Sequence, residues 1–295
     1  MLLVLFGFWR RTEGVGRPIA SRSPVTVSHL FCLGLETHVT GRKDHYYNKS
    51  KQEGYRSRAA YKLEQLDRET GLLGDGKTVV DLGAAPGGWL QVAAEAVGPD
   101  GRVIGVDLQR IAPLEDHDVE TIRGDMTDED TRERVVEAAG GSVDVVVSDM
   151  APNMTGEYSV DHARSVYLAR QALETALELL DSGGDFAVKV FDGQDFEAFR
   201  EDVEAEFEYA RVLRPDASRD SSSEVYVVGK HRLTTDLREG DVVDVTIEDT
   251  GAEGDGIAYV DGYTVFVSEA DPGDSLTVEI TGVKPRFGFA DVVES

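Results

Sequence analysis

Short apolar runs alternate with amphipathic stretches along the middle of the chain, from residue 78 to residue 228. The runs are rich in Val and Ile, and helical spacing between them is typical of a mostly parallel sheet covered by helices on both faces. No helical stretch separates the last two runs, so we expect them to pair antiparallel at one edge. The pattern predicts helices near 90–97, 128–139, 160–180 and 194–207, and strands at TVVDL, RVIGVD, ETIRGDM, VDVVVSD, DFAVKVF, 210–213 and 225–228.

The pattern changes after Lys230. Residues 236–295 have no helical period and instead carry short β-type runs separated by Gly, Asp and Pro, which predicts a small all-β barrel. We therefore predict an α/β, Rossmann-like domain over 39–230 with a mostly parallel seven-stranded sheet and an antiparallel edge strand. A linker over 231–235 and the barrel over 236–295 follow it.

The first 38 residues differ in charge from the rest of the chain. They carry four Arg against two Glu, a net charge of +2, which leaves −28 for the remainder. The apolar run MLLVLFGFW precedes Arg10 and Arg11 and has no small-residue cleavage site, unlike a secretory signal. We interpret residues 1–38 as a segment outside the evolved fold, with translation starting near Val39. The alternative is a short flexible basic arm.

Acidic residues dominate the composition. Asp and Glu outnumber Lys and Arg by 56 to 30, for a net charge of −26, while 41% of residues are hydrophobic. This is too apolar for a disordered acidic chain, so we expect the charge on a folded surface. Such a surface is typical of haloarchaeal proteins, which stay soluble in molar salt where the screening length is about 3 Å.

Cysteine and histidine usage argues against metal sites and disulfides. The only cysteine, Cys32, has no partner for a disulfide within the chain, and the six histidines do not cluster with it at metal-ligand spacing. No apolar run reaches the roughly 18 residues of a membrane span. We therefore expect a cytoplasmic protein without a metal and without a membrane contact.

The stretch TVVDLGAAPGGW, from Thr78 to Trp89, combines a strand, a tight turn and a helix start. In open α/β sheets such a turn lies at the carboxyl edge, where nucleotide-like ligands bind. It is not G-x-G-x-x-G and no Lys-Ser/Thr follows, so dinucleotide and triphosphate sites are poor matches. Glycines at 83, 87 and 88 and the flat Trp89 side chain suit the nucleoside and methionyl parts of S-adenosylmethionine. The alternative is a plain βα turn.

Two further carboxylates end neighbouring strands. Asp107 lies roughly 20 residues after the glycine turn, where a carboxylate accepts hydrogen bonds from both ribose hydroxyls of a nucleoside. Asp125 follows the next apolar run and is a candidate for the adenine amino group. A turn-capping role is an equal alternative for Asp125.

Lys189 lies inside the apolar run FAVKVF, where an unpaired ammonium would be expensive to bury. The predicted fold brings it near Asp149, at the end of another strand, and near Lys62 and Glu224. As a functional group it would accept a proton. The alternatives are a snorkelling side chain and a buried ion pair that only shapes the core.

From Lys43 to Lys230 the chain resembles the FtsJ family of ribose 2′-O-methyltransferases, and within it the branch acting on large-subunit ribosomal RNA. The resemblance lies in RSRAAYKL, VVDLGAAPGGWLQ, SDMAPNMTG, YLARQALE, FAVKVF and RPDASRDSSSEVYVV, in this order. It implies the class I S-adenosylmethionine-dependent methyltransferase fold and a catalytic tetrad with Lys189 as proton acceptor, completed by Lys62, Asp149 and Glu224. The residues implied to contact the cofactor are Gly87, Trp89, Asp107, Asp125 and Asp149.

A basic aromatic segment, Arg42–Lys62, is the first candidate for RNA binding. It has seven basic residues against Asp44 and Glu53, interleaved with tyrosines at 46, 47, 55 and 61. Basic side chains hold phosphates and aromatic rings stack on bases. The alternative is a helix with snorkelling Lys and Arg side chains.

The C-terminal barrel resembles a TRAM domain, a small barrel that accompanies RNA-modifying enzymes. The similarity lies in EGDGIAYVDGYTVFV and the PGD that follows. Bacterial members of the ribosomal RNA branch lack this extension, so a second RNA-binding surface could redirect the enzyme. Its expected contact patch is Lys284, Arg286, Phe287 and Phe289, although the two phenylalanines are equally candidates for the core.

Together these resemblances imply S-adenosylmethionine-dependent 2′-O-methylation of a uridine in the A-loop of 23S rRNA, with the large ribosomal subunit as partner. We expect the enzyme to act as a monomer. The alternatives are a tRNA ribose 2′-O-methyltransferase of the same family and a non-catalytic RNA-binding assembly factor. The complete tetrad favours an enzyme.

Removal of residues 1–38 should leave activity intact, because their charge balance departs from that of the remaining chain and the family resemblance begins at Lys43. The check is to compare methyl transfer and thermal unfolding for the full chain and for a chain starting at Val39. A large loss of folding or turnover in the shorter chain would show that the segment belongs to the protein.

Overall fold

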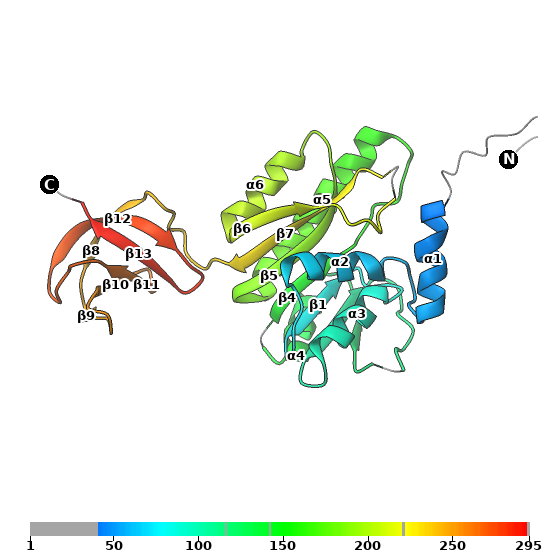
Figure 1. Cartoon of the computed structure of the whole chain (residues 1–295), viewed down its shortest axis with the longest axis horizontal. Coiled ribbons are helices and arrows are strands. Elements are labelled where there is room, and N and C mark those ends of the chain that lie inside the picture. Colours follow the sequence, from blue (N-terminus) through cyan, green and yellow to red (C-terminus); the bar gives the residue numbers. More distant parts are fainter. Residues whose placement is uncertain (1–40, 116, 142, 220–221, 294–295) are drawn as a thin grey trace, which may run out of the picture. The chain divides into compact units, whose positions relative to one another are not determined.

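The computed structural model describes residues 41–293, apart from 116, 142, 220 and 221, and the side chains from His45 onward (Figure 1). The predictions made for residues 1–38, and Cys32 with them, lie outside this part. Within it, no helix is long and apolar enough to cross a membrane. The same part contains no group of three or more His, Cys, Asp or Glu side chains arranged to hold a metal ion.

Seven strands form the first sheet, in the order β3-β2-β1-β4-β5-β7-β6. All neighbours pair parallel except β7, which pairs antiparallel with both β5 and β6. The mostly parallel sheet is confirmed, and the antiparallel strand lies one position inside the edge strand β6. The bounds are β1 Thr78–Leu82, β2 Arg102–Asp107, β3 Glu120–Arg123, β4 Val143–Ser148, β5 Leu180–Phe191, β6 Phe207–Leu213 and β7 Glu224–Arg232.

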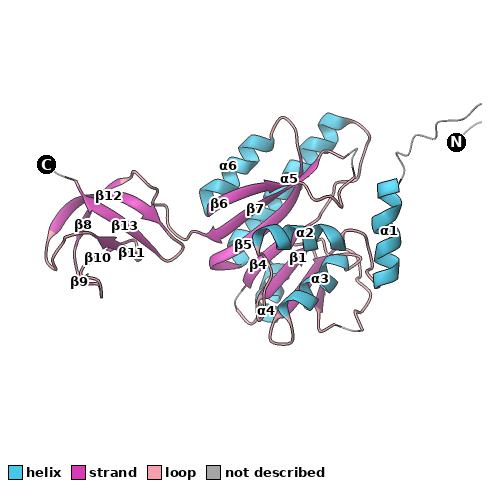
Figure 2. Ribbon diagram, in the orientation of Figure 1, coloured by secondary structure: helices cyan, strands magenta, loops and turns pink. Residues whose placement is uncertain are grey.

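Helices cover both faces of this sheet, as the near-continuous apolar strands require. Successive strand residues such as Val79 and Val80 face two different cores, because side chains alternate along a strand. One core is completed by α2 and α3, and the other by α4, α5 and α6 (Figure 2). The bounds are α1 Gly41–Glu53, α2 Ala60–Thr70, α3 Gly88–Val97, α4 Glu129–Ala139, α5 Tyr158–Leu179 and α6 Phe196–Glu206.

The strand order reverses between β1 and β4. From β1 the chain moves outward to β2 and β3, then returns to place β4 on the other side of β1. Loops that leave two adjacent parallel strands in opposite directions open a crevice at their carboxyl ends, where ligands bind. The glycine turn after β1 and Asp149 after β4 lie at this point.

The C-terminal residues form a second sheet with the order β8-β12-β13-β11-β10-β9. Its own apolar core includes Val245, Ile247, Val265 and Ile280, so the predicted all-β unit is confirmed. The strand β7 continues to Arg232, two residues beyond the predicted end of the first domain. The bounds are β8 Val242–Thr246, β9 Asp249–Thr250, β10 Gly256–Val260, β11 Tyr263–Val267, β12 Ser275–Val283 and β13 Phe287–Val292.

Candidate active site

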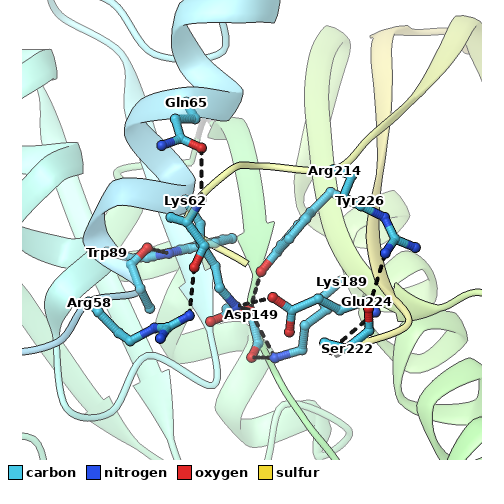
Figure 3. A network of polar contacts seen from close by, with 12 residues as sticks. Arg58, Lys62, Gln65, Trp89, Asp149, Lys189, Arg214, Ser222, Glu224 and Tyr226 are labelled. Carbon is cyan, nitrogen blue, oxygen red and sulfur yellow. Dashed lines mark hydrogen bonds and ion pairs between the residues drawn. The ribbon is translucent and has the colours of Figure 1, made fainter. Parts of the chain in front are cut away.

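The four residues of the predicted tetrad meet at the carboxyl end of the first sheet (Figure 3). Lys189, on β5, is only 6% exposed, and its Nζ donates to the backbone oxygen of Asp149 at 2.5 Å and to Asp149 Oδ1 at 2.9 Å. Because β4 and β5 are parallel neighbours, the end of one strand lies beside the lysine of the other. Lys189 is therefore a buried, paired lysine and not a snorkelling one.

Lys62 enters the site from α2, on the other side of Asp149. Its Nζ lies 3.4 Å from Asp149 Oδ1 and 2.9 Å from Glu224 Oε1, and the residue is 7% exposed. Glu224 opens β7, which runs antiparallel to β5 and pairs it with Phe191. Two lysines and two carboxylates thus form one continuous ion-pair network.

Tyr226 is a member of this network that the sequence analysis missed. It is fully buried, it pairs with Lys189 across β5 and β7, and its hydroxyl donates to Asp149 Oδ1 at 2.5 Å. Its ring lies 6.0 Å from that of Trp89 and 5.6 Å from Lys62 Nζ. The sequence contained only a weak signal for Tyr226, because a tyrosine in the run VYVV is as typical of an ordinary buried strand as of a functional site.

The charges of the network keep both carboxylates ionised. Burial raises the pKa of Asp149, but the ammonium groups of Lys189 and Lys62 outweigh it, so its pKa lies below its usual value. Burial also raises the pKa of Glu224, but the ammonium group of Lys62 outweighs it, so the pKa of Glu224 lies below its usual value. Burial and the two carboxylates raise the pKa of Tyr226 well above its usual value, so its hydroxyl stays protonated and remains a donor.

The turn after β1 has a backbone suited to glycine. Gly83 and Gly87 have φ angles of 79° and 105°, a region that other residues rarely adopt. A Cβ on Gly83 would lie 2.2 Å from Cγ of Met150. Trp89 differs from its expected role as an open apolar wall: it is 3% exposed, and its Nε1 donates to the backbone oxygen of Ala59 at 2.7 Å. The indole therefore anchors α3 to the start of α2.

The two other predicted cofactor carboxylates have different surroundings. Asp107 ends β2 and accepts hydrogen bonds from the backbone nitrogens of Ala85, at 2.9 Å, and Gln109, at 2.7 Å. It thereby ties the glycine turn to β2. Asp125 Oδ1 accepts from both the backbone nitrogen and the hydroxyl of Thr127, at 3.0 and 2.8 Å, which is the turn-capping arrangement. Its other oxygen, Oδ2, takes no part in this cap.

Asp81, at the end of β1, is an additional candidate. It is 2% exposed, and its Oδ2 has no hydrogen-bond partner in the part of the chain that the structure describes. Burial, Asp149 and Asp107 all raise its pKa well above the usual value of 3.8. A buried, unpartnered oxygen beside the glycine turn is a receptor for a positively charged or hydrogen-bond-donating group of a ligand. The sequence did contain a signal for Asp81, because a carboxylate inside the apolar run TVVDL is costly to bury without a partner.

The basic aromatic segment does not form the predicted aromatic surface. Tyr61 is 1% exposed and donates to Glu53 at 2.7 Å, while Tyr55 is half-buried and donates to Glu64 and Glu95 at 2.9 and 2.8 Å. Tyr46 is also half-buried, at 3.2 Å from the Gln65 amide nitrogen. Only Tyr47, of the four, is exposed, so most rings of this segment hold α1 and α2 in place.

The predicted contact patch of the second sheet is exposed. Phe287 and Phe289 are 38% and 43% exposed, and each ring contacts the other and Phe266 at centroid distances of 5.5–6.1 Å. We call these three rings the phenylalanine triad. Arg286 beside them is also exposed, whereas Lys284 is half-buried. Of the two alternatives left open for the phenylalanines, the exposed position is therefore the one in the structure, and a place in the core is not.

Comparison with known proteins agrees with this geometry. The family described as FtsJ-like methyltransferase matches residues 55–232, and the family described as TRAM domain matches residues 236–293. A protein of Halorubrum lacusprofundi named Ribosomal RNA large subunit methyltransferase E is 66% identical over 253 residues, covering 85% of this chain and 94% of that protein. The protein of the same name from Haloarcula marismortui is 62% identical over 260 residues, covering 85% and 99%.

A solved structure extends the comparison to the fold. A ribosomal RNA methyltransferase from Plasmodium falciparum superposes with a TM-score of 0.54 at 26% sequence identity, covering 60% of this chain and 98% of that one.

Asp81→Asn should make the cofactor-free protein more stable than the wild type, increasingly so as pH rises. A carboxyl whose pKa is raised by folding stabilises the fold below its unfolded pKa, near 3.8, and loses that contribution as pH rises through the folded value. Asparagine has the same shape and does not ionise. Denaturant unfolding of both proteins from acidic to alkaline pH measures the difference, and a difference independent of pH would contradict the assigned environment.

Proposed function

This chain belongs to the FtsJ-like methyltransferase family, and we propose that it methylates the 2′-hydroxyl of a uridine in the A-loop of 23S rRNA, using S-adenosylmethionine. The observation that carries the proposal is Lys189: a buried lysine whose nitrogen is aimed by two hydrogen bonds to Asp149 at the ligand-binding edge of the sheet. The names of its haloarchaeal relatives support large-subunit ribosomal RNA as the substrate.

The residues of the site suit S-adenosylmethionine, the cofactor of this family. When bound, it supplies an electrophilic methyl group on a positively charged sulfonium, which is also the leaving group. The glycine turn at Gly83 and Gly87 would hold the nucleoside and methionyl parts, and Asp107 would accept the ribose hydroxyls. The unpartnered Oδ2 of Asp81 matches the ammonium of the methionyl part in charge and in hydrogen bonding. Asp125 retains a carboxylate oxygen for the adenine amino group.

Lys189 would accept the proton of the 2′-hydroxyl. A neutral lysine has two N–H groups and one lone pair, and two donors from Nζ already point to Asp149. In this neutral form the lone pair would occupy the remaining position on Nζ, where the substrate hydroxyl could reach it. There Lys189 would hold the hydroxyl proton that the 2′-oxygen gives up when it takes the methyl group supplied by the cofactor.

The other members of the network orient Lys189 and the ribose. Asp149 fixes the Lys189 nitrogen, and Lys62 and Tyr226 fix Asp149. Glu224 balances the charge of Lys62, with the two charged atoms 2.9 Å apart. We assign this pair the role of holding the ribose. Alignment is a large part of catalysis in such a displacement, because the leaving group needs no activation.

We propose the assembled or free large-subunit rRNA as partner, a cytoplasmic site of action and a monomeric enzyme. The tRNA alternative differs only in the RNA bound outside the catalytic network. A non-catalytic assembly factor would have no need of a buried lysine paired in this way, because burying two ammonium groups costs several kcal/mol per ion before pairing compensates.

Lys189→Ala should lower the maximal rate of methyl transfer by about 10²- to 10⁴-fold, the usual contribution of a general base. Cofactor affinity should change little, because Lys189 acts on the proton. Labelled-methyl transfer from S-adenosylmethionine is measured with separate pools of tRNA, naked rRNA and large subunits that lack the modification, followed by nucleotide mapping.

Asp107→Ala is the matched comparison, because it should mainly weaken cofactor binding. Methylation mapped to tRNA instead of the A-loop would replace the proposed substrate and keep the reaction. For Lys189→Ala, the contradicting outcome is near-normal turnover at saturating RNA and cofactor, which would remove the assignment of Lys189 as general base.

The TRAM barrel should supply RNA affinity that survives high salt. Each phosphate contact makes log affinity fall with log salt at a slope of about −0.7 to −0.9, whereas stacking on aromatic rings does not depend on charge. Removing residues 236–295, or changing Phe287 and Phe289 together to Ala, should raise the Michaelis constant for RNA, most strongly at high salt, with a smaller effect on the maximal rate.

The control for this measurement is Arg286→Ala, which should weaken binding mainly at low salt and reduce the salt slope by about one contact. Equal RNA affinity with and without the two phenylalanines across the working salt range, in proteins with unchanged thermal unfolding, would rule out the role of the triad.

A further inference from the structure

One stripe of α5 holds the loop that follows the Lys189 strand. Tyr158, His162 and Ser165 are spaced i, i+4 and i+7, so they lie on one face of the helix. The Ser165 hydroxyl accepts from the backbone nitrogen of Phe191 at 3.0 Å, and His162 Nε2 accepts from that of Asp195 at 3.1 Å. These contacts hold the chain at both ends of the loop, at the last residue of β5 and at the residue before α6.

Tyr158 completes this stripe, and its ring is fixed in two ways. The hydroxyl donates to the backbone oxygen of Asp192 at 2.6 Å. The ring stacks on the buried His162 ring, with centroids 6.2 Å apart and planes 11° apart. Gly193 leaves space for the imidazole, because a Cβ there would lie 2.6 Å from His162 Nδ1. The orientation of the tyrosine is therefore set before any ligand binds.

Despite these contacts Tyr158 is 62% exposed. A tyrosine at the surface normally loses rotamer freedom when it binds a ligand, at a cost of about 0.5–1.5 kcal/mol for an immobilised side chain. Here the hydrogen bond to Asp192 and the stack on His162 have already restricted it. The exposed part of the ring is a preorganised aromatic surface that the catalytic network does not use.

Tyr158 lies at the rim of the catalytic site. Asp192 follows Lys189 by three residues of extended chain, about 10 Å. The backbone nitrogen of Asp192 donates to Ser223, the residue before Glu224, at 2.8 Å. The Tyr158 hydroxyl is therefore bonded to the loop at the carboxyl end of the Lys189 strand, and that loop is bonded in turn to the residue before Glu224.

The charges around Tyr158 favour a base over a phosphate. Glu157, Asp192 and Asp195 are all exposed, and their carboxylates repel phosphate groups. Stacking of a base on the ring does not require a positive charge, so these carboxylates and high salt weaken it less than a phosphate contact. Any base can stack in this way, since every base has a π-face.

We propose that Tyr158 is a stacking site for an unpaired base that flanks the methylated ribose of the RNA substrate. The inference rests on the proposed function, because it takes RNA as the substrate class. It assigns Tyr158 a contact with RNA and assigns His162 the role of positioning the ring.

The test compares Tyr158→Ala, Tyr158→Leu and Tyr158→Phe in the full chain. The control is Tyr167→Ala, because Tyr167 is 63% exposed on the same helix but nine residues away, about 180° around it. The probe is a short single-stranded RNA with the A-loop sequence, carrying 2-aminopurine beside the target uridine, whose fluorescence is quenched on stacking. Affinity and quenching are measured without turnover, and kcat and KM are measured separately.

Ala and Leu at position 158 should weaken RNA binding about 5- to 150-fold, the range for losing one stacked base, and abolish the quenching. Phe keeps the ring and should stay within about threefold of the wild type. The proposal would be overturned if Tyr158→Ala changed RNA affinity no more than Tyr167→Ala does. It would also be overturned if Tyr158→Phe lost as much affinity as Tyr158→Ala, because the hydroxyl would then have a purely structural role. Wild-type protein that binds the probe with quenching but does not methylate it would contradict the proposed function alone.

Discussion

The candidate active site depends on one carboxylate oxygen, Oδ1 of Asp149. Lys189, Lys62 and the Tyr226 hydroxyl all point to it, at 2.9, 3.4 and 2.5 Å. The two lysines are almost fully buried, so each needs a charged partner inside the protein, and removing one partner of a buried pair typically costs about 3–5 kcal/mol. This requirement ties α2, β4, β5 and β7 together at the edge of the sheet.

The same arrangement separates two tasks in space. The turn after β1 and Asp107 at the end of β2 line the side where the cofactor would bind, whereas β5 and β7 carry Lys189 and Glu224, the residues proposed to act on the substrate ribose. Asp149, after β4, lies between them because β4 is the strand beside both β1 and β5. The reversal of strand order at β1 and β4 thus places the glycine turn and Lys189 on either side of Asp149, as the proposed reaction requires.

A strongly acidic surface constrains how this protein holds RNA. Phosphate contacts lose strength in high salt, so a neutral π-surface gains relative importance. Among the exposed rings, Tyr158 and the pair Phe287 and Phe289 are the ones we propose to serve this purpose. Tyr55 and Tyr61 of the basic aromatic segment serve another purpose, because their hydroxyls donate to carboxylates such as Glu64 and Glu53.

The sequence by itself determined the repeating strands and helices and the change to a β domain near residue 236, and its family resemblance supplied the four residues of the expected tetrad. Apolar periodicity carries the elements, and a lysine in FAVKVF or an aspartate after VDVVVS is conspicuous because burying a charge is costly. Only the tertiary structure decided which aromatic rings are exposed. Tyr55, Tyr61, Phe287 and Phe289 look alike in a sequence, and their burial depends on residues far along the chain. The tertiary structure likewise determined the contacts of Tyr226 and Tyr158, since their partners, Asp149 and Asp192, become neighbours only when strands and helices pack.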